Sequence, residues 1–172
     1  PWLAERVQSL LAPKVAVKGD HRWGLDHGTW SVLLKAFPDA DVPVVQLSLD
    51  QGLSPAGHLE VGKLLAPLRK EGILIIGSGN IVHNLRVMEW SDNAKPYAWA
   101  TSFNEAIKNA ILSRDSAKLC NPMSEGVSAA NSLPTDEHYL PLLYAFGAAS
   151  EADDVEFAPD FIQYKSLSMT AG

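Results

Sequence analysis

Short apolar runs alternate with segments of helical period along this 172-residue chain, and this alternation restricts its fold more than any other feature. Apolar residues recur every three to four positions over residues 2–11 and 97–113, as on the buried face of an amphipathic helix. Residues 15–17, 42–49 and 73–76 are short, β-branched runs typical of strands. The alternation predicts an α/β layered domain, with a central, mostly parallel or mixed sheet flanked by helices.

Composition excludes several classes of function. The chain has 14 Lys and Arg against 20 Asp and Glu, so it lacks the basic surface that nucleic acid or an anionic membrane would require. No apolar run approaches the roughly 18 residues of a spanning helix. A single cysteine, Cys120, excludes an internal disulfide framework and favours a reducing, cytoplasmic location. We therefore expect no nucleic-acid or membrane partner.

The five histidines are the residues best suited to carry chemistry. His58 shares a helical face with apolar residues and is expected to pack in the core, whereas His21 lies in a charged loop and is expected to be solvated. His83 follows a predicted strand, where ligands of α/β sheets gather. His27 precedes one predicted helix and His138 lies in the first turn of another, a position that keeps an imidazole neutral. Position alone leaves a shared site and separate structural roles equally open.

Local motifs do not decide between a shared histidine site and separate structural roles. The chain has no Cys-x-x-Cys pair, HExxH, P-loop or G-x-S-x-G elbow. The Gly-Ser-Gly-Asn stretch at 77–80 lacks the spacing and the lysine of a phosphate loop, which favours a tight strand exit. Asp26 could orient His27 or cap a helix. Glu137 is not expected to share a metal with His138, because neighbours on a helix point in different directions.

Five stretches of sequence, in a fixed order, carry a family resemblance. They are WGLDHGTW at 23–30, VVQLS at 44–48, GSGNIVHNL at 77–85, PYAW at 96–99 leading to Phe103, and EHYLPL at 137–142. Together they resemble the DOPA 4,5-dioxygenase (LigB-like) group of class III extradiol ring-cleavage dioxygenases. The resemblance extends over most of the chain, from about residue 7 to residue 169.

The resemblance implies an oxidoreductase that opens the ring of a catechol-type aromatic diol with O₂ at one divalent non-haem metal, Fe(II) functionally or Zn(II) as isolated. It implies that His83 and His138 are metal ligands, and that His27 handles protons or orients the substrate. In more distant extradiol enzymes the histidine that matches His83 acts as a base, so His83 is also a catalytic candidate. Histidine suits the protons of a catechol near neutral pH, and O₂ activation needs a redox metal with open positions.

One departure from the family concerns the metal ligands. Family members carry Gly-His-Gly-Ser-Pro and Ser-Ala-His-Trp motifs, each with a metal histidine, and neither motif occurs in these 172 residues. We therefore expect residues 1–172 to be a single catalytic domain that lacks the family's N-terminal third. A further segment of the same protein would then be a partner that supplies histidine ligands. Two alternatives stay open: a zinc-dependent hydrolase or lyase on the same scaffold, and an inactive truncated remnant.

Overall fold

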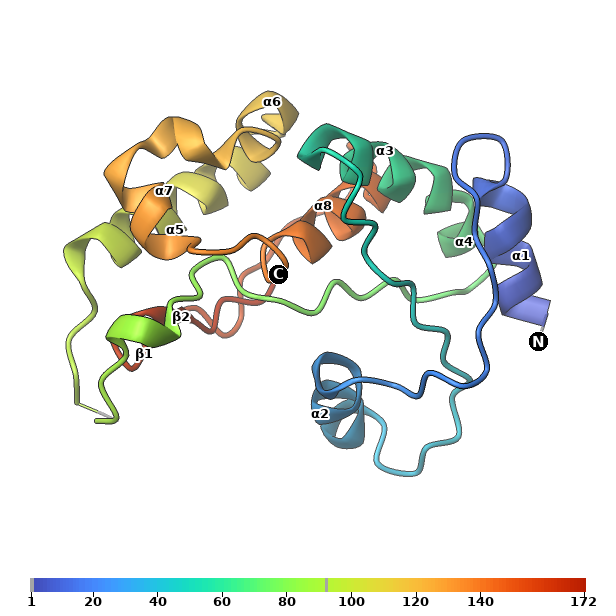
Figure 1. The fold of residues 1–172 in the computed structure, drawn as a ribbon, viewed down its shortest axis with the longest axis horizontal. Coiled ribbons are helices and arrows are strands. Elements are labelled where there is room, and N and C mark those ends of the chain that lie inside the picture. Colours follow the sequence, from blue (N-terminus) through green and yellow to red (C-terminus); the bar gives the residue numbers. More distant parts are fainter. Residues whose placement is uncertain (1, 92) are drawn as a thin grey trace.

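The computed structural model describes residues 2–91 and 93–172, and most of its regular structure is helical (Figure 1). The helices are α1 (Trp2–Leu11), α2 (His27–Ala36), α3 (Pro55–Leu65), α4 (Pro67–Lys70), α5 (Ala98–Leu112), α6 (Ser116–Leu119), α7 (Val127–Ser132) and α8 (Leu140–Ala148). Two 3₁₀ turns (Leu85–Val87 and Pro122–Glu125) and the strands β1 (Ile162–Gln163) and β2 (Leu167–Ser168) complete the elements. None of the helices in the described ranges is both long enough and apolar enough to cross a bilayer.

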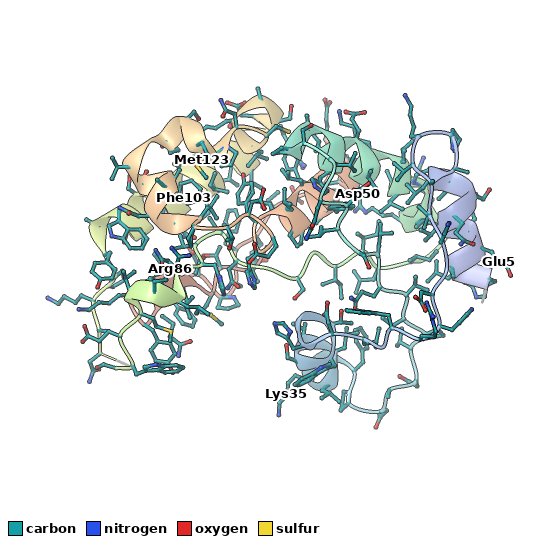
Figure 2. All side chains as sticks on the ribbon, viewed as in Figure 1. Glu5, Lys35, Asp50, Arg86, Phe103 and Met123 are labelled. Carbon is teal, nitrogen blue, oxygen red and sulfur yellow. The ribbon has the colours of Figure 1, made fainter. Side chains whose placement is uncertain are left out.

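Two apolar clusters hold the elements other than α2 together. The larger one includes Phe103 and Ile107 of α5, both fully buried, and Leu143 of α8. The smaller one lies between α1 and α3 and includes Leu11 and Leu65. Figure 2 shows Phe103 packed among the helices of the larger cluster, whereas Lys35 lies on α2, apart from them. The predicted helices at 2–11 and 97–113 are confirmed by α1 and α5.

Helices α3 and α8 cross so closely that two positions accommodate only glycine. A Cβ atom on Gly147 would lie 2.5 Å from the carbonyl oxygen of Leu59, and one on Gly62 would lie 2.6 Å from that of Tyr144. Both obstacles are backbone atoms, which cannot swing aside as a flexible side chain does. The crossing therefore fixes α8, and with it the turn that precedes α8.

Gly147→Ala should lower the free energy of unfolding by about 1–3 kcal/mol, because α3 and α8 must move apart to admit the methyl group. The gain in helix propensity, about 1 kcal/mol, offsets only part of this loss. Urea unfolding followed by circular dichroism measures the difference. Gly24→Ala is the matched control, since no described heavy atom lies within 4 Å of a Cβ built there. Equal midpoints for the two variants would contradict the close crossing.

The predicted central sheet is not formed by the described residues. Their only ladder is the antiparallel hairpin of β1 and β2. Residues 15–17, 42–49 and 73–76 run as extended chain, and no backbone–backbone hydrogen bond among the described residues joins one of these segments to another. The prediction that they are strands of a central sheet is therefore not confirmed by the described residues, because a strand requires a neighbour that takes up its N–H and C=O groups.

The alternation of burial that a strand would show is nevertheless present in residues 15–17 and 73–76. One set of side chains packs with α1 and α3: Val15, Val17, Leu47, Ile73 and Ile75. The intervening Leu74 and Ile76 are exposed, at 69% and 49% of their surface. The apolar runs thus bury one face against helices, as the layered fold predicts, while the opposite face carries no second layer among the described residues.

Candidate functional site

The structure brings His83 and His138 into direct contact. Their ring centroids lie 3.5 Å apart and their ring planes are inclined by only 21°, so the two imidazoles are stacked. Both side chains are half-buried. Of the five histidines, these two are the predicted metal ligands, and the fold places them side by side although they are far apart in sequence.

Backbone hydrogen bonds on both sides hold His83. Its N–H donates to the carbonyl oxygen of Ser132 at 2.9 Å, and it forms an isolated bridge with Leu167. The N–H of Ser168 donates to the carbonyl oxygen of Val82 at 2.9 Å. His83 therefore lies between the end of α7 and the C-terminal hairpin, which leaves only its side chain free to turn.

The Gly-Ser-Gly-Asn turn at 77–80 holds His138. The N–H of Asn80 donates to the carbonyl oxygen of His138 at 2.8 Å. A Cβ on Gly79 would lie 2.1 Å from the same oxygen. His138 lies in the turn before α8 rather than in the first helical turn, so the predicted effect of a helix end on its ring does not apply as stated. The predicted strand exit is not confirmed, because the residues before this turn pair with no neighbouring strand among the described residues, and the observed role of the turn is close backbone approach.

The pair favours a neutral imidazole at His83. Burial and the neighbouring His138 ring hold the pKa of His83 below its ordinary value, because each opposes a positive charge there, and the Glu137 carboxylate offsets this only in part. The Glu137 carboxylate lies 3.7 Å from Nε2 of His138. At neutral pH the ring of His83 is therefore available to accept a proton.

The stacked arrangement limits how this pair could hold a metal. A ring nitrogen binds a metal along its lone pair, which lies in the ring plane, at about 2.0–2.1 Å for zinc. Two nearly parallel planes 3.5 Å apart do not converge at such a distance. In residues 2–91 and 93–172, moreover, no three His, Cys, Asp or Glu side chains are grouped to hold a metal ion. The described residues therefore do not form a complete metal site by themselves.

His27 is exposed and is the first residue of α2. Asp26 caps this helix by accepting a hydrogen bond from the N–H of Thr29 at 3.0 Å, so capping is the observed role of that carboxylate. The hydroxyl of Ser78 donates to the carbonyl oxygen of Gly28 at 2.7 Å. The structure thus joins the start of α2 to the turn that holds His138. Across the described residues, no hydrogen bond or ring stack links the His27 imidazole to the stacked pair.

The remaining two histidines behave as predicted. His58 is fully buried, and its Nδ1 lies 2.8 Å from the hydroxyl oxygen of Tyr144. Its Nε2 has no hydrogen-bond partner among the described residues. Burial lowers the pKa of His58, with Asp136 and Asp50 opposing the shift. His21 is exposed.

Protonation of His58 should make the protein less stable in acid. The pKa of the folded state is below the ordinary value of 6.5, so the unfolded chain binds the proton more tightly. The free energy of unfolding should therefore fall as the pH is lowered below about 6.5, by at most about 1.4 kcal/mol per pH unit for one group. Urea unfolding between pH 8 and pH 5 measures how steeply the free energy of unfolding falls as the pH is lowered. This slope should be smaller for His58→Gln than for the control His21→Gln. Equal slopes would contradict the assignment.

The sequence of the chain is similar to those of known proteins. A family model described as the catalytic LigB subunit of aromatic ring-opening dioxygenase matches residues 3–171. The 4,5-DOPA dioxygenase extradiol of Escherichia coli (strain K12) is 46% identical, over 98% of this chain and 63% of its own length. That of Portulaca grandiflora is 40% identical, over 91% of this chain and 58% of its own length. The chain therefore spans about three fifths of the length of these curated relatives.

A solved structure shows the fold. The crystal structure of an uncharacterized protein from Escherichia coli K12 superimposes with a TM-score of 0.89 at 44% sequence identity. The match covers 98% of this chain and 70% of that one. The helices, the extended segments and the C-terminal hairpin thus have the arrangement of that larger fold.

Proposed function

The chain belongs to the family of catalytic LigB subunits of aromatic ring-opening dioxygenases, and from that premise we propose that the whole protein is an extradiol dioxygenase. Its reaction would open the ring of a catechol-type aromatic with O₂, as a step of aromatic compound metabolism similar to that of a DOPA 4,5-dioxygenase. The observation that carries the proposal is the stacked pair of His83 and His138. Two imidazoles from separate motifs meet there beside a glycine turn.

We propose a separate role for each ring of the pair. The family resemblance implies that both histidines bind the metal. The nearly parallel rings support a division of roles instead, because their lone pairs do not converge on one ion. In this division His138 is the metal ligand and His83 is the base. One divalent non-haem metal, Fe(II) functionally or Zn(II) as isolated, would supply Lewis acidity and open positions for the diol and O₂. The remaining ligands would come from the additional length of a full-size family member.

His83 and His27 would handle protons. A neutral His83 takes a hydroxyl proton from the diol and returns it after ring opening, which histidine does efficiently near neutral pH. His27, at the exposed start of α2, would orient the diol or relay the proton. A reducing cytoplasmic location, which the single Cys120 favours, would keep Fe(II) in its reduced state.

Oxygen uptake tests the proposal. The full-length protein, loaded anaerobically with Fe(II), is mixed with aerated buffer and a panel of catechols including DOPA. We expect one O₂ consumed per ring opened for at least one member of the panel, and no reaction without O₂. Turnover with Zn(II) under strict anaerobic conditions would support the hydrolase or lyase instead. Full metal loading with no turnover on any catechol would point to an inactive remnant.

A further inference from the structure

The side chain of Gln46 forms hydrogen bonds at both ends of the first turn of α2. Its Oε1 accepts hydrogen bonds from the N–H of Asp26 at 3.0 Å and from the hydroxyl of Thr29 at 2.8 Å. Its Nε2 donates to the carboxylate of Asp26 at 2.8 Å. These three bonds reach the residue before His27 and a residue two positions after it. His27, although exposed, thus lies in a turn whose two ends are hydrogen-bonded to one distant side chain.

Helix α2 has little else to hold it in place. None of its ten residues, all of them described, is buried. Figure 1 shows α2 standing apart from the other helices, between two long extended segments. Beyond Gln46, the bond from the hydroxyl of Ser78 to the carbonyl oxygen of Gly28 ties this turn to the rest of the chain. A helix anchored by so few contacts depends strongly on each of them.

Only an amide side chain satisfies this arrangement. The position requires an oxygen that accepts two hydrogen bonds and a donor that faces a carboxylate. An ionised glutamate has no donor and would repel Asp26, and leucine has neither group. The same carboxylate caps α2 through its other oxygen, so Gln46 orients the cap as well as the backbone.

We infer that Gln46 is a positioning residue for His27, acting by closing the first turn of α2 around it. The inference rests on the proposed function only where it concerns catalysis. Its structural part, the ordering of α2 by Gln46, stands on the hydrogen bonds alone. Among the described residues the Gln46 side chain forms hydrogen bonds with Asp26 and Thr29 and none with the stacked pair, so its effect on turnover would pass through His27.

A double-mutant cycle in the full-length protein tests the catalytic part. Gln46→Leu and the near-isosteric Gln46→Glu should each lower kcat about 10-fold or more, with little change in KM for the diol. In a His27→Ala background the same substitutions should change kcat less than about 2-fold, because the group they position is already absent. The matched control is Gln51→Leu, at an exposed glutamine in the turn before α3. Equal losses in both backgrounds, or no loss in either, would overturn the inference.

Hydrogen exchange separates this inference from the proposed function. Gln46→Leu should speed amide exchange across α2 at least about 10-fold and leave α5 unchanged, whether or not the protein turns over a catechol. Unchanged exchange in α2 would overturn the inference by itself. Faster exchange confined to α2, in a protein that turns over no catechol, would support the ordering role of Gln46 and leave only the proposed function contradicted.

Discussion

His83→Ala should lower ring-opening turnover of the full-length protein by about 10²–10⁴-fold, the usual contribution of a positioned general base. The ring of His83 is half-buried and stacked on His138, and burial keeps its pKa below the ordinary value, so at neutral pH it is a neutral base in contact with the proposed ligand. Because the variant removes a proton acceptor rather than a binding group, kcat should fall while KM for the diol changes little. Initial rates of oxygen uptake over a range of catechol concentrations measure both.

The same substitution at His21, which is exposed in a loop, serves as its control and should leave kcat within about 2-fold of the parent, since surface substitutions are usually neutral. Folding must be checked alongside, by thermal unfolding of both variants. A fully active His83→Ala protein would remove His83 from the reaction. It would also make the stack with His138 a packing contact only.

Gly79→Ala should lower turnover by about 10²-fold or more by moving His138. The added methyl group would lie 2.1 Å from the carbonyl oxygen of His138, and the N–H of the next residue, Asn80, donates to that oxygen. This hydrogen bond joins the turn at 77–80 to the turn at 136–140. The added methyl group must therefore displace the turn at 136–140. Displacements of about 1 Å at a catalytic group cost rate on this scale.

Two measurements distinguish this displacement from general unfolding. In the stack, each imidazole ring alters the chemical shifts of the ring protons of the other. Proton NMR should therefore show changed chemical shifts for the His83 and His138 ring protons in Gly79→Ala. Gly24→Ala, where a Cβ meets no described atom within 4 Å, should leave both the spectrum and turnover unchanged. Normal turnover and an unmoved spectrum in Gly79→Ala would contradict the role given to the turn.

Helices could be predicted from the sequence because their signals are local. The apolar period over 2–11 and 97–113 places Leu11 and Phe103 inward, and both are fully buried in α1 and α5. Strands could not be predicted to the same extent, because a strand depends on a partner as well as on its own pattern. Residues 73–76 show the alternation of a half-buried strand, but no neighbour among the described residues completes it.

The site was predictable only in part. Chain position alone left the histidines undecided, and the motifs around His83 and His138 selected them through the family resemblance. That the two rings stack could not be seen in the sequence, because the contact depends on the glycine turn meeting the segment before α8. The two glycines at 77 and 79 were the available signal for such an approach. Gln46 gave no local signal, since its partners lie about 20 residues away.

The division of roles within the stacked pair is tested most directly by the metal content of two variants. Full-length His138→Ala and His83→Ala are loaded with Fe(II), desalted under anaerobic conditions and measured by elemental analysis beside the parent protein. We expect His138→Ala to lose most of its iron and His83→Ala to retain it at the parent level while turning over poorly. Iron retained in full by His138→Ala, or lost from His83→Ala alone, would contradict the account.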